Sequence, residues 1–311
     1  MKNDLFGGLT CPRKKLHRTT THDGDTPRLR LHGTFLRGDP VVVVKRYLCL
    51  DCGRTFSDAT TTFEYRQRRR DINLPLFKLM ASNITQRRAA KVLSIARRTV
   101  ESRLPYFDKV ARAHHKILLE TRSKSTHVHF DDMETSEHTK LKPLSIPLAV
   151  DHSSRIIIGY DVAQMPAKGK TASISRAKYG TRKDLRHLAW ENVLKSVAST
   201  SIRDVEITSD SHKRYPEMIR KFVPGAMHVQ VKSRRACVAG QGELKLGGFD
   251  PIFSINHTAA MLRANMSRLI RRTWCTTKLA EKLLCHISLY VLWHNETILA
   301  KLEGRQVKFP F

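Results

Sequence analysis

A short cysteine motif restricts most tightly how the N-terminal part of this chain can fold. Residues 41–48 read VVVVKRYL, a β-branched run typical of a strand, and lead directly into Cys49-Leu-Asp-Cys52-Gly53. Two cysteines separated by two residues on a tight turn can both reach one tetrahedral ion, and Gly53 gives that turn the backbone freedom it needs. The motif therefore predicts one half of a zinc-ribbon-like β unit, which we assign to residues 1–60.

The second half of this predicted zinc site is incomplete in the sequence. Cys11-Pro12 resembles the start of a first cysteine pair, but no cysteine follows it, and His17 is our candidate for the fourth ligand. His22 and His32 are alternatives for that position. The competing interpretation is a strand-rich unit without metal, in which Cys49 and Cys52 are ordinary thiols. The remaining cysteines have no ligand-like spacing and are interpreted as small core residues: Cys237, Cys275 and Cys285.

Positive charge is spread along the whole chain of 311 residues, whose formal net charge is +28. Residues 1–122 carry 26 basic and 11 acidic side chains, and residues 123–311 carry 30 and 17. Such a distribution predicts a polyanionic partner that contacts both halves of the protein. Aromatic residues make up only 7%, which favours duplex DNA over a stacked single strand. Neither a membrane span nor a secretory signal is apparent, so we expect a cytoplasmic, nucleoid-associated protein without a membrane partner.

Residues 61–122 follow the pattern of a basic linker and a helix-turn-helix. The charge run Tyr65-Arg-Gln-Arg-Arg-Arg70 lies in the linker, residues 61–73. Residues 74–122 then show helical periodicity, with Thr85 as the predicted N-cap of a helix that turns Ala89, Ala90, Val92 and Leu93 inward. The next helix, ARRTVESRL, buries Val100 and Leu104 and exposes the side chains predicted to contact DNA: Arg97, Arg98, Thr99, Ser102 and Arg103. A generic helical bundle is the alternative.

Residues 123–311 alternate between strand-like and helix-like stretches, which predicts an α/β domain. Strands are expected at 127–130, 144–150, 155–162, 205–208 and 227–231, an amphipathic helix over 183–198, and a long basic helix from His257. Asp131 and Asp132 end the first of these strands, Asp210 follows the fourth, and Asn256 leads into the last helix. Ligands gather at strand ends in α/β sheets, and oxygen ligands of this kind suit Mg²⁺. The spacing also fits ordinary turn residues, and Asn256 also fits a helix N-cap.

Taken together, the parts resemble bacterial insertion-sequence transposases of the DDE type, which join a zinc ribbon, a helix-turn-helix and an RNase H-like catalytic domain. The segment YLCLDCGRTFSD resembles their ribbon. Three later segments resemble their catalytic blocks: HFDDMETSEHTKLKPLSIPLAVD, ITSDSHKRYPEMI and NHTAAMLRANMSRLIRRTWCTTK. The resemblance extends over most of the chain and implies an RNase H-like mixed sheet flanked by helices in residues 123–311.

The resemblance also implies an activity and a set of site residues. It implies metal-dependent DNA cleavage and strand transfer with Mg²⁺ or Mn²⁺ at Asp131, Asp210 and Asn256. Asn256 stands where the family usually has Glu, and Glu243 is the alternative third carboxylate. Zn²⁺ is expected at Cys11, His17, Cys49 and Cys52. A basic loop and the last helix are expected to contact phosphates through Lys168, Lys170, Arg176, Lys178, Arg263, Arg268, Arg271 and Arg272.

The expected partner is double-stranded DNA, namely the terminal repeats of the mobile element and the target DNA. The family resemblance also implies a homodimer or higher oligomer on DNA. Asn256 leaves a second function open, a DNA-binding regulator derived from a transposase that has lost catalysis. A structural nucleoid protein is a third possibility, distinguished by binding without sequence preference and with a steep salt dependence.

Overall fold

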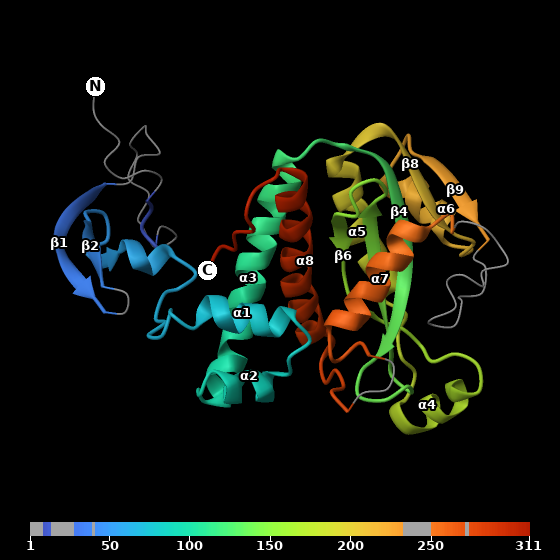
Figure 1. Cartoon of the computed structure of the whole chain (residues 1–311), viewed down its shortest axis with the longest axis horizontal. Coiled ribbons are helices and arrows are strands. Elements are labelled where there is room, and N and C mark those ends of the chain that lie inside the picture. The colour runs from blue at the N-terminus through green and yellow to red at the C-terminus, as the bar shows by residue number, and fades with distance from the viewer. Residues whose placement is uncertain (1–8, 14–27, 39–40, 233–249, 271–273) are drawn as a thin grey trace. The chain divides into compact units, whose positions relative to one another are not determined.

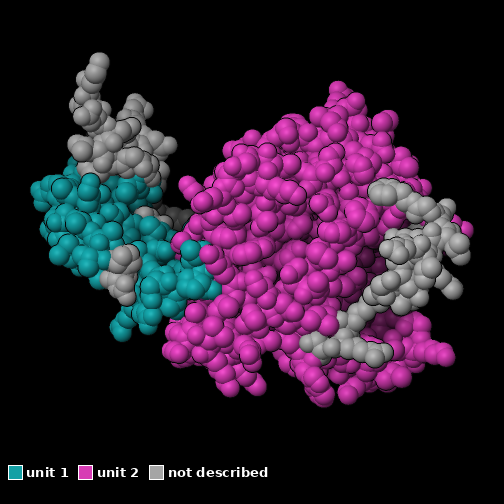
Figure 2. Space-filling view, in the orientation of Figure 1, with its two compact units in different colours: residues 1–75 teal, residues 76–311 magenta. Residues whose placement is uncertain are grey.

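The computed structural model of this chain separates into two compact units, residues 1–75 and 76–311 (Figure 2). No described helix is long and apolar enough to cross a membrane. The residues described are 9–13, 28–38, 41–232, 250–270 and 274–311.

The first unit contains a three-stranded antiparallel sheet with the order β1-β2-β3. Strands β1 and β2 are labelled in Figure 1. Its middle strand β2 confirms the strand expected at 41–48. The strand ends at Cys49, the first cysteine of the Cys49–Cys52 motif. A backbone hydrogen bond closes the turn that follows β2, because Gly53 N donates to Cys49 O at 2.9 Å. Gly53 adopts φ +65°, a conformation that favours glycine. The bounds are β1 (Leu29–Arg37), β2 (Val42–Cys49), β3 (Thr55–Ser57) and a short 3-10 helix η2 (Asp58–Thr61).

Three helices follow where the sequence predicted them: α1 (Asn73–Ala81), α2 (Gln86–Val92) and α3 (Arg97–Thr121). Thr85 caps α2 as predicted, because its Oγ1 accepts a hydrogen bond from Arg88 N at 3.3 Å. Ala89 and Ala90 are buried, but the expectation that Val92 faces inward was wrong, since this side chain is 57% exposed. Leu93, the next residue, packs against the core that α2 shares with α1 and α3, so Val92 lies off the inward face of the helix.

These helices share one core with the C-terminal helix α8 (Ala280–Leu302), which packs along α3 (Figure 1). Phe77 is fully buried at the centre of this core, with its ring 4.6 Å from that of Phe311 and 6.2 Å from that of Phe107. The compact unit therefore begins at residue 76 and includes the helical segment, whereas the sequence had placed a boundary at 122.

A mixed sheet forms the centre of the second unit, with the strand order β6-β5-β4-β8-β9. β4 is antiparallel to β5, and β5 to β6, while β4, β8 and β9 run parallel. Helices cover this sheet, so the predicted mixed α/β sheet flanked by helices is confirmed. The bounds are β4 (Ser125–Ser136), β5 (Pro143–Asp151), β6 (Ile157–Tyr160), β7 (Ala163–Gln164, beside β5), β8 (Ser201–Asp210) and β9 (Met227–Val231).

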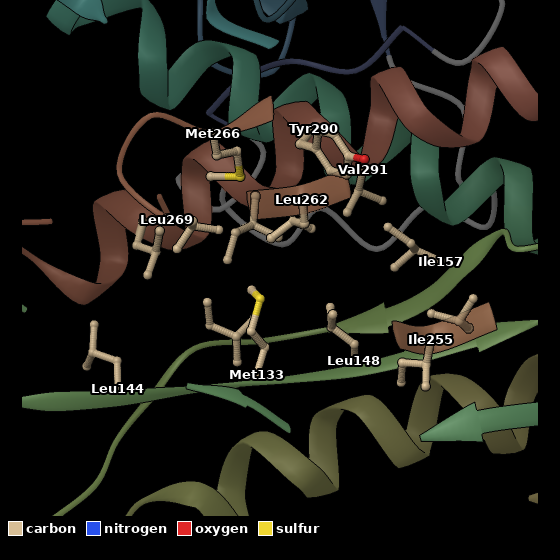
Figure 3. Close-up of a cluster of buried hydrophobic side chains, with 14 of the residues drawn as sticks. Met133, Leu144, Leu148, Ile157, Ile255, Leu262, Met266, Leu269, Tyr290 and Val291 are labelled. Atoms are coloured by element: carbon tan, nitrogen blue, oxygen red, sulfur yellow. The ribbon is translucent and has the colours of Figure 1, made fainter. Parts of the chain in front are cut away.

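The two faces of this sheet bury different helices. One face packs against α7 (Phe253–Asn265) and α8, and Figure 3 shows Leu148 and Met133 of the sheet opposite Leu262. The other face packs against α5 (Arg186–Thr200) and α6 (Tyr215–Phe222) through Phe130 and Trp190. Because strand residues alternate between faces, neighbours in sequence reach different helices. A further helix, α4 (Thr171–Tyr179), follows β7.

Replacing Phe77 by Ala is expected to destabilise the second unit by about 3–5 kcal/mol, the usual cost of truncating a buried aromatic side chain. Phe77 is 0% exposed, so the change leaves a cavity between four aromatic rings. Denaturant unfolding monitored by circular dichroism measures the effect. Ile117→Ala on α3 is the control, because this side chain is 59% exposed and its loss should change stability by less than about 1 kcal/mol. Equal effects of the two substitutions would contradict the assignment of this core.

Candidate functional site

Strand register brings Asp131 and Asp210 together on neighbouring strands. Phe130 of β4 pairs with Ser209 of β8 in the parallel ladder, so the residues that follow them, Asp131 and Asp210, stand at the same level. Both lie on the sheet face that packs against α7, because Asp131 pairs with Leu148, a core residue of that face. The strand also corrects one expectation: β4 continues through Asp131 to Ser136 rather than ending before it.

The environment of Asp131 disfavours its ionised form. Burial and the negative charge of Asp210 raise the pKa of Asp131 to about 7. Its Oδ1 accepts a hydrogen bond from Asp132 N at 2.7 Å, and Oδ1 of Asp210 accepts one from His212 N at 3.0 Å. These backbone bonds hold both carboxylates in place without neutralising them. The pair is therefore a site of concentrated negative charge that favours a cation or a proton.

Asp132 lies on the opposite face of the sheet. Its two carboxylate oxygens accept hydrogen bonds from Trp190 Nε1 of α5, each at 2.9 Å. Burial raises the pKa of Asp132 to about 6. Asp132 thus joins β4 to α5, whereas Asp131 faces α7. The sequence placed both acids at one strand end and could not separate these two roles.

Helix α7 carries the predicted third ligand, and its first turn differs from the sequence expectation. The helix begins at Phe253, so Asn256 lies inside the first turn and is not an N-cap. Asn256 is exposed, and its Nδ2 donates to Asp250 Oδ2 at 2.7 Å. Seven residues later, Arg263 lies on the same side of the helix, and its positive charge lowers the pKa of Asp131. The role of Asn256 as a metal ligand stays a prediction. The alternative carboxylate, Glu243, is outside the described residues.

Three cysteines of the first unit converge as the sequence predicted. Cys11, Cys49 and Cys52 place their sulfur atoms within 4.8 Å of one another, and Sγ of Cys11 lies 3.8 Å from Sγ of Cys52. Tetrahedral zinc with Zn–S bonds of about 2.3 Å separates its sulfur ligands by about 3.8 Å, so the donor set fits this ion. Burial, with smaller contributions from Cys49 and Cys52, raises the pKa of the Cys11 thiol to about 11 against the opposing hydrogen bond from Arg13 N. A bound cation would favour the thiolate instead.

The sequence offered three histidines as candidates for the fourth zinc ligand. His17 and His22 are outside the described part of the chain. The alternative His32 is exposed on β1, and the metal-ligand grouping found among the described residues of this unit contains only the three cysteines.

The predicted recognition helix forms the first turns of α3. Arg97 and Arg98 are exposed, and Arg97 Nε pairs with Glu101 at 2.8 Å. Ser102 is exposed and Thr99 is half-buried. The expectation that Arg103 is exposed was wrong, since only 8% of it is accessible. Arg103 follows Val100 by three residues and therefore lies on the buried side of the helix.

The other predicted phosphate contacts are only partly described. Lys168 Nζ pairs with Glu134 Oε1 at 2.7 Å, and Lys170 is the N-cap residue of α4, which also carries Arg176 and Lys178. Arg268 does not lie on the last basic helix as expected, because α7 ends at Asn265 and Arg268 sits half-buried in the turn that follows. Arg271 and Arg272 are outside the described residues, as is Cys237.

Sequence reasoning missed a cluster of three histidines beside the acidic pair. His127, His129 and His152 bring ring nitrogens within 4.8 Å of one another. The sequence contains one local signal for them, because His127 and His129 are alternate residues of a predicted strand and so share a face. His152 joins them only through the pairing of β4 with β5.

Comparison with known proteins gives only distant structural similarity. No family model and no curated protein matches the chain. It is similar to the simian T-cell lymphotropic virus intasome in complex with PP2A regulatory subunit B56 gamma, at 10% identity and a TM-score of 0.25, over 70% of this chain and 65% of that chain. It is similar to the Mos1 strand transfer complex at 10% identity and a TM-score of 0.24, over 76% of this chain and 79% of that one. For the Mos1 mariner paired end complex with Mn, identity is 11% and the TM-score 0.25, over 76% of this chain and 80% of that one.

Proposed function

We propose that this chain is a transposase that cleaves and joins DNA at an acidic site formed by Asp131 and Asp210. The observation that carries the proposal is the register of β4 and β8, which sets these two carboxylates side by side on one sheet face. Three antiparallel strands joined to a parallel half, in the order β6-β5-β4-β8-β9, also agree with the RNase H-like domain that the sequence motifs imply.

The acidic pair has the donor set of a Mg²⁺ or Mn²⁺ site. Carboxylate oxygens suit these ions, and burial together with the charge of Asp210 makes ionised Asp131 costly, a cost that a bound cation offsets. A divalent cation at such a site stabilises negative charge that develops on a phosphate during cleavage. Asp131 and Asp210 hold the ion, and Asn256 is the proposed third ligand. Arg263, whose charge already reaches Asp131, is positioned to bind a phosphate nearby.

DNA binding is assigned to the basic N-terminal parts of the chain. Arg97, Arg98, Thr99 and Ser102 occupy the start of α3, which we propose as the recognition helix of a helix-turn-helix. The β unit of residues 1–60, with zinc at Cys11, Cys49 and Cys52 and His17 as the proposed fourth ligand, supplies a second contact. The net charge of +28 accounts for a strong and salt-sensitive attraction to duplex DNA.

A specific observation favours a second candidate function, a DNA-binding regulator without catalysis. Asn256 is hydrogen-bonded to Asp250, and Arg263 places a positive charge near Asp131 from the same helix. An internal cation of this kind partly replaces the charge that a metal ion would provide. In a regulator, Arg263 would keep the acidic pair folded and inactive.

Cleavage of a duplex that carries the ends flanking the coding region separates these two functions. For a transposase we expect nicking at those ends in Mg²⁺ and in Mn²⁺ and none in a chelator, beside specific binding in a gel-shift assay. Specific binding without cleavage in either metal would overturn the catalytic assignment and leave the regulator. DNA binding without sequence preference would contradict both the transposase and the regulator and would favour a structural nucleoid protein.

Replacing Asn256 by Glu is expected to lower cleavage by roughly tenfold or more in a working transposase. The introduced carboxylate cannot donate to Asp250 and would repel it, which displaces the start of α7. Single-turnover cleavage measures the change, and Gln at position 256, which retains the amide, should be the milder substitution. A gain of cleavage from an inactive wild-type protein would instead show that Asn256 marks lost catalysis.

Replacing Cys49 by Ser is expected to remove one equivalent of bound zinc and to destabilise the first unit. Cys49 is fully buried beside the other two thiols, so the site loses one of its three described ligands. Metal analysis of the dialysed protein measures the zinc content. Cys285→Ser is the control, because Cys285 lies in the other unit beside the α3–α8 core. Unchanged zinc content in Cys49→Ser would contradict the proposed site.

A further inference from the structure

A cluster of three histidines lies on the sheet face that also carries Asp131. His127 and His129 are alternate residues of β4 and therefore project from one face. His152 follows β5 directly, and its backbone N donates to His127 O at 3.0 Å, which anchors it beside that strand. One ring nitrogen of each histidine lies within 4.8 Å of the other two.

The spacing of these nitrogens is close to that of ligands on one ion. Nε2 of His129 and Nδ1 of His152 lie 3.0 Å apart. Tetrahedral zinc with Zn–N bonds of about 2.0–2.1 Å separates its nitrogen ligands by about 3.3 Å. The rings of His127 and His152 stack with centroids 4.3 Å apart, so all three imidazoles already converge.

The hydrogen bonds around the cluster are also those of a ligand set. Nε2 of His127 lies 2.9 Å from Thr208 Oγ1 and 3.4 Å from Glu206 Oε1. Bonds of this kind orient metal-bound histidines, and here they leave the other ring nitrogen of His127 for a ligand. His129 is fully buried, yet its Nδ1 has no hydrogen-bond partner among the described residues. The nitrogen of His129 that faces His152 is Nε2, so Nε2 is the atom that would bind an ion, and Nδ1 lies on the other side of the ring.

We propose that His127, His129 and His152 bind a transition-metal ion of the zinc type. Imidazole nitrogens select Zn²⁺, Co²⁺ or Ni²⁺ over Mg²⁺, so this site is chemically distinct from the acidic pair. The proposal does not rest on the proposed DNA chemistry.

The bound ion would join three separate parts of the catalytic-domain fold. His127 and His129 belong to β4, and His152 belongs to the turn after β5. A hydrogen bond links this turn to α7, because Ser254 Oγ donates to His152 O at 2.7 Å. An ion at this point therefore ties the start of α7 to the strand that carries Asp131, and we expect it to stabilise that arrangement.

A cobalt titration of the full-length chain tests the site. The protein carries Cys49→Ser and Cys52→Ser, which remove two of the three thiolate ligands of the cysteine site, and excess Mg²⁺ occupies oxygen sites. We expect one equivalent of Co²⁺ to produce visible d–d bands without a thiolate charge-transfer band, and Zn²⁺ to displace it. His152→Gln should weaken binding by at least about 100-fold, because even groups behind a ligand contribute 10–100-fold to affinity. His187→Gln, at an exposed histidine outside the cluster, should leave it unchanged.

Two results would overturn the proposal. One is a folded double-serine protein, as judged by circular dichroism, that gives no cobalt spectrum. The other is a His152→Gln protein that binds cobalt as tightly as its parent. If the double-serine protein does not fold, the zinc content is measured in proteins that keep Cys49 and Cys52. There His152→Gln must lower the zinc content by one equivalent relative to His187→Gln, and equal contents would also overturn the proposal.

Discussion

Replacement of Asp210 by Asn is expected to lower metal-dependent DNA cleavage by about 10³-fold or more while specific DNA binding persists. The substitution keeps the shape of the side chain and its bond from His212 N, but it removes one of the two facing negative charges. Charge stabilisation at a phosphoryl centre contributes several kcal/mol, and each 1.36 kcal/mol is a factor of ten in rate. Single-turnover cleavage and gel-shift binding on the same duplex measure the two properties.

Asp204→Asn is the matched control for this prediction. Asp204 lies on the same strand β8 but is exposed, so this change alters the net charge equally without reaching the acidic pair. We expect its cleavage rate to stay within about twofold of wild type, since surface substitutions of this kind are usually mild. Wild-type cleavage by Asp210→Asn would refute the proposed site, and an equal loss in both variants would point to charge alone.

Replacement of Asp131 by Asn is expected to stabilise the metal-free protein at neutral and alkaline pH. Burial and Asp210 raise the pKa of Asp131 from 3.8 to about 7 in the folded state. Between these two values the folded protein retains a proton that the unfolded chain releases, so stability falls as pH rises. At 1.36 kcal/mol for each pKa unit, the loss approaches about 4 kcal/mol above pH 7. The Asn side chain cannot ionise and escapes this loss.

Denaturant unfolding in a chelator at about pH 4 and about pH 8 measures this effect. The stability advantage of Asp131→Asn should be small at the lower pH and largest at the higher one. Mg²⁺ should stabilise the wild-type protein at the higher pH and have little effect on the variant. Asp204→Asn should show neither behaviour. A stability difference between Asp131→Asn and wild type that does not change with pH would contradict the charge repulsion described above.

The sequence was most informative where a local pattern carried the signal. The run that became β2, the capping residue Thr85 and the strand before Asp210 were all recognisable, because each depends on near neighbours in the chain. Cys49 and Cys52 were identified in the same way, since a two-residue spacing on a turn is itself the ligand geometry. Asp131 and Asp210 were chosen as strand-end acids, and the strands do bring them together.

Local patterns were least informative where packing decided the outcome. Arg103 was expected at a DNA surface, and its helical position instead places it in the core beside Val100. The helices of residues 74–122 were expected to form a domain of their own, and their apolar side packs in one core with α8 from the other end of the chain. No pattern within either segment could specify that partner.

The amino-acid sequence by itself determined the basic character of the protein, the alternation of its strands and helices, and the chemical types of its candidate ligands. These properties follow from composition and from the short periods of helices and strands. Only the tertiary structure decided which residues meet. The register of β4 with β8 placed Asp131 level with Asp210, the pleat directed Asp132 toward Trp190, and the pairing of β4 with β5 brought His152 to His129. Such contacts join residues far apart in sequence, and only the packing of the whole sheet specifies them.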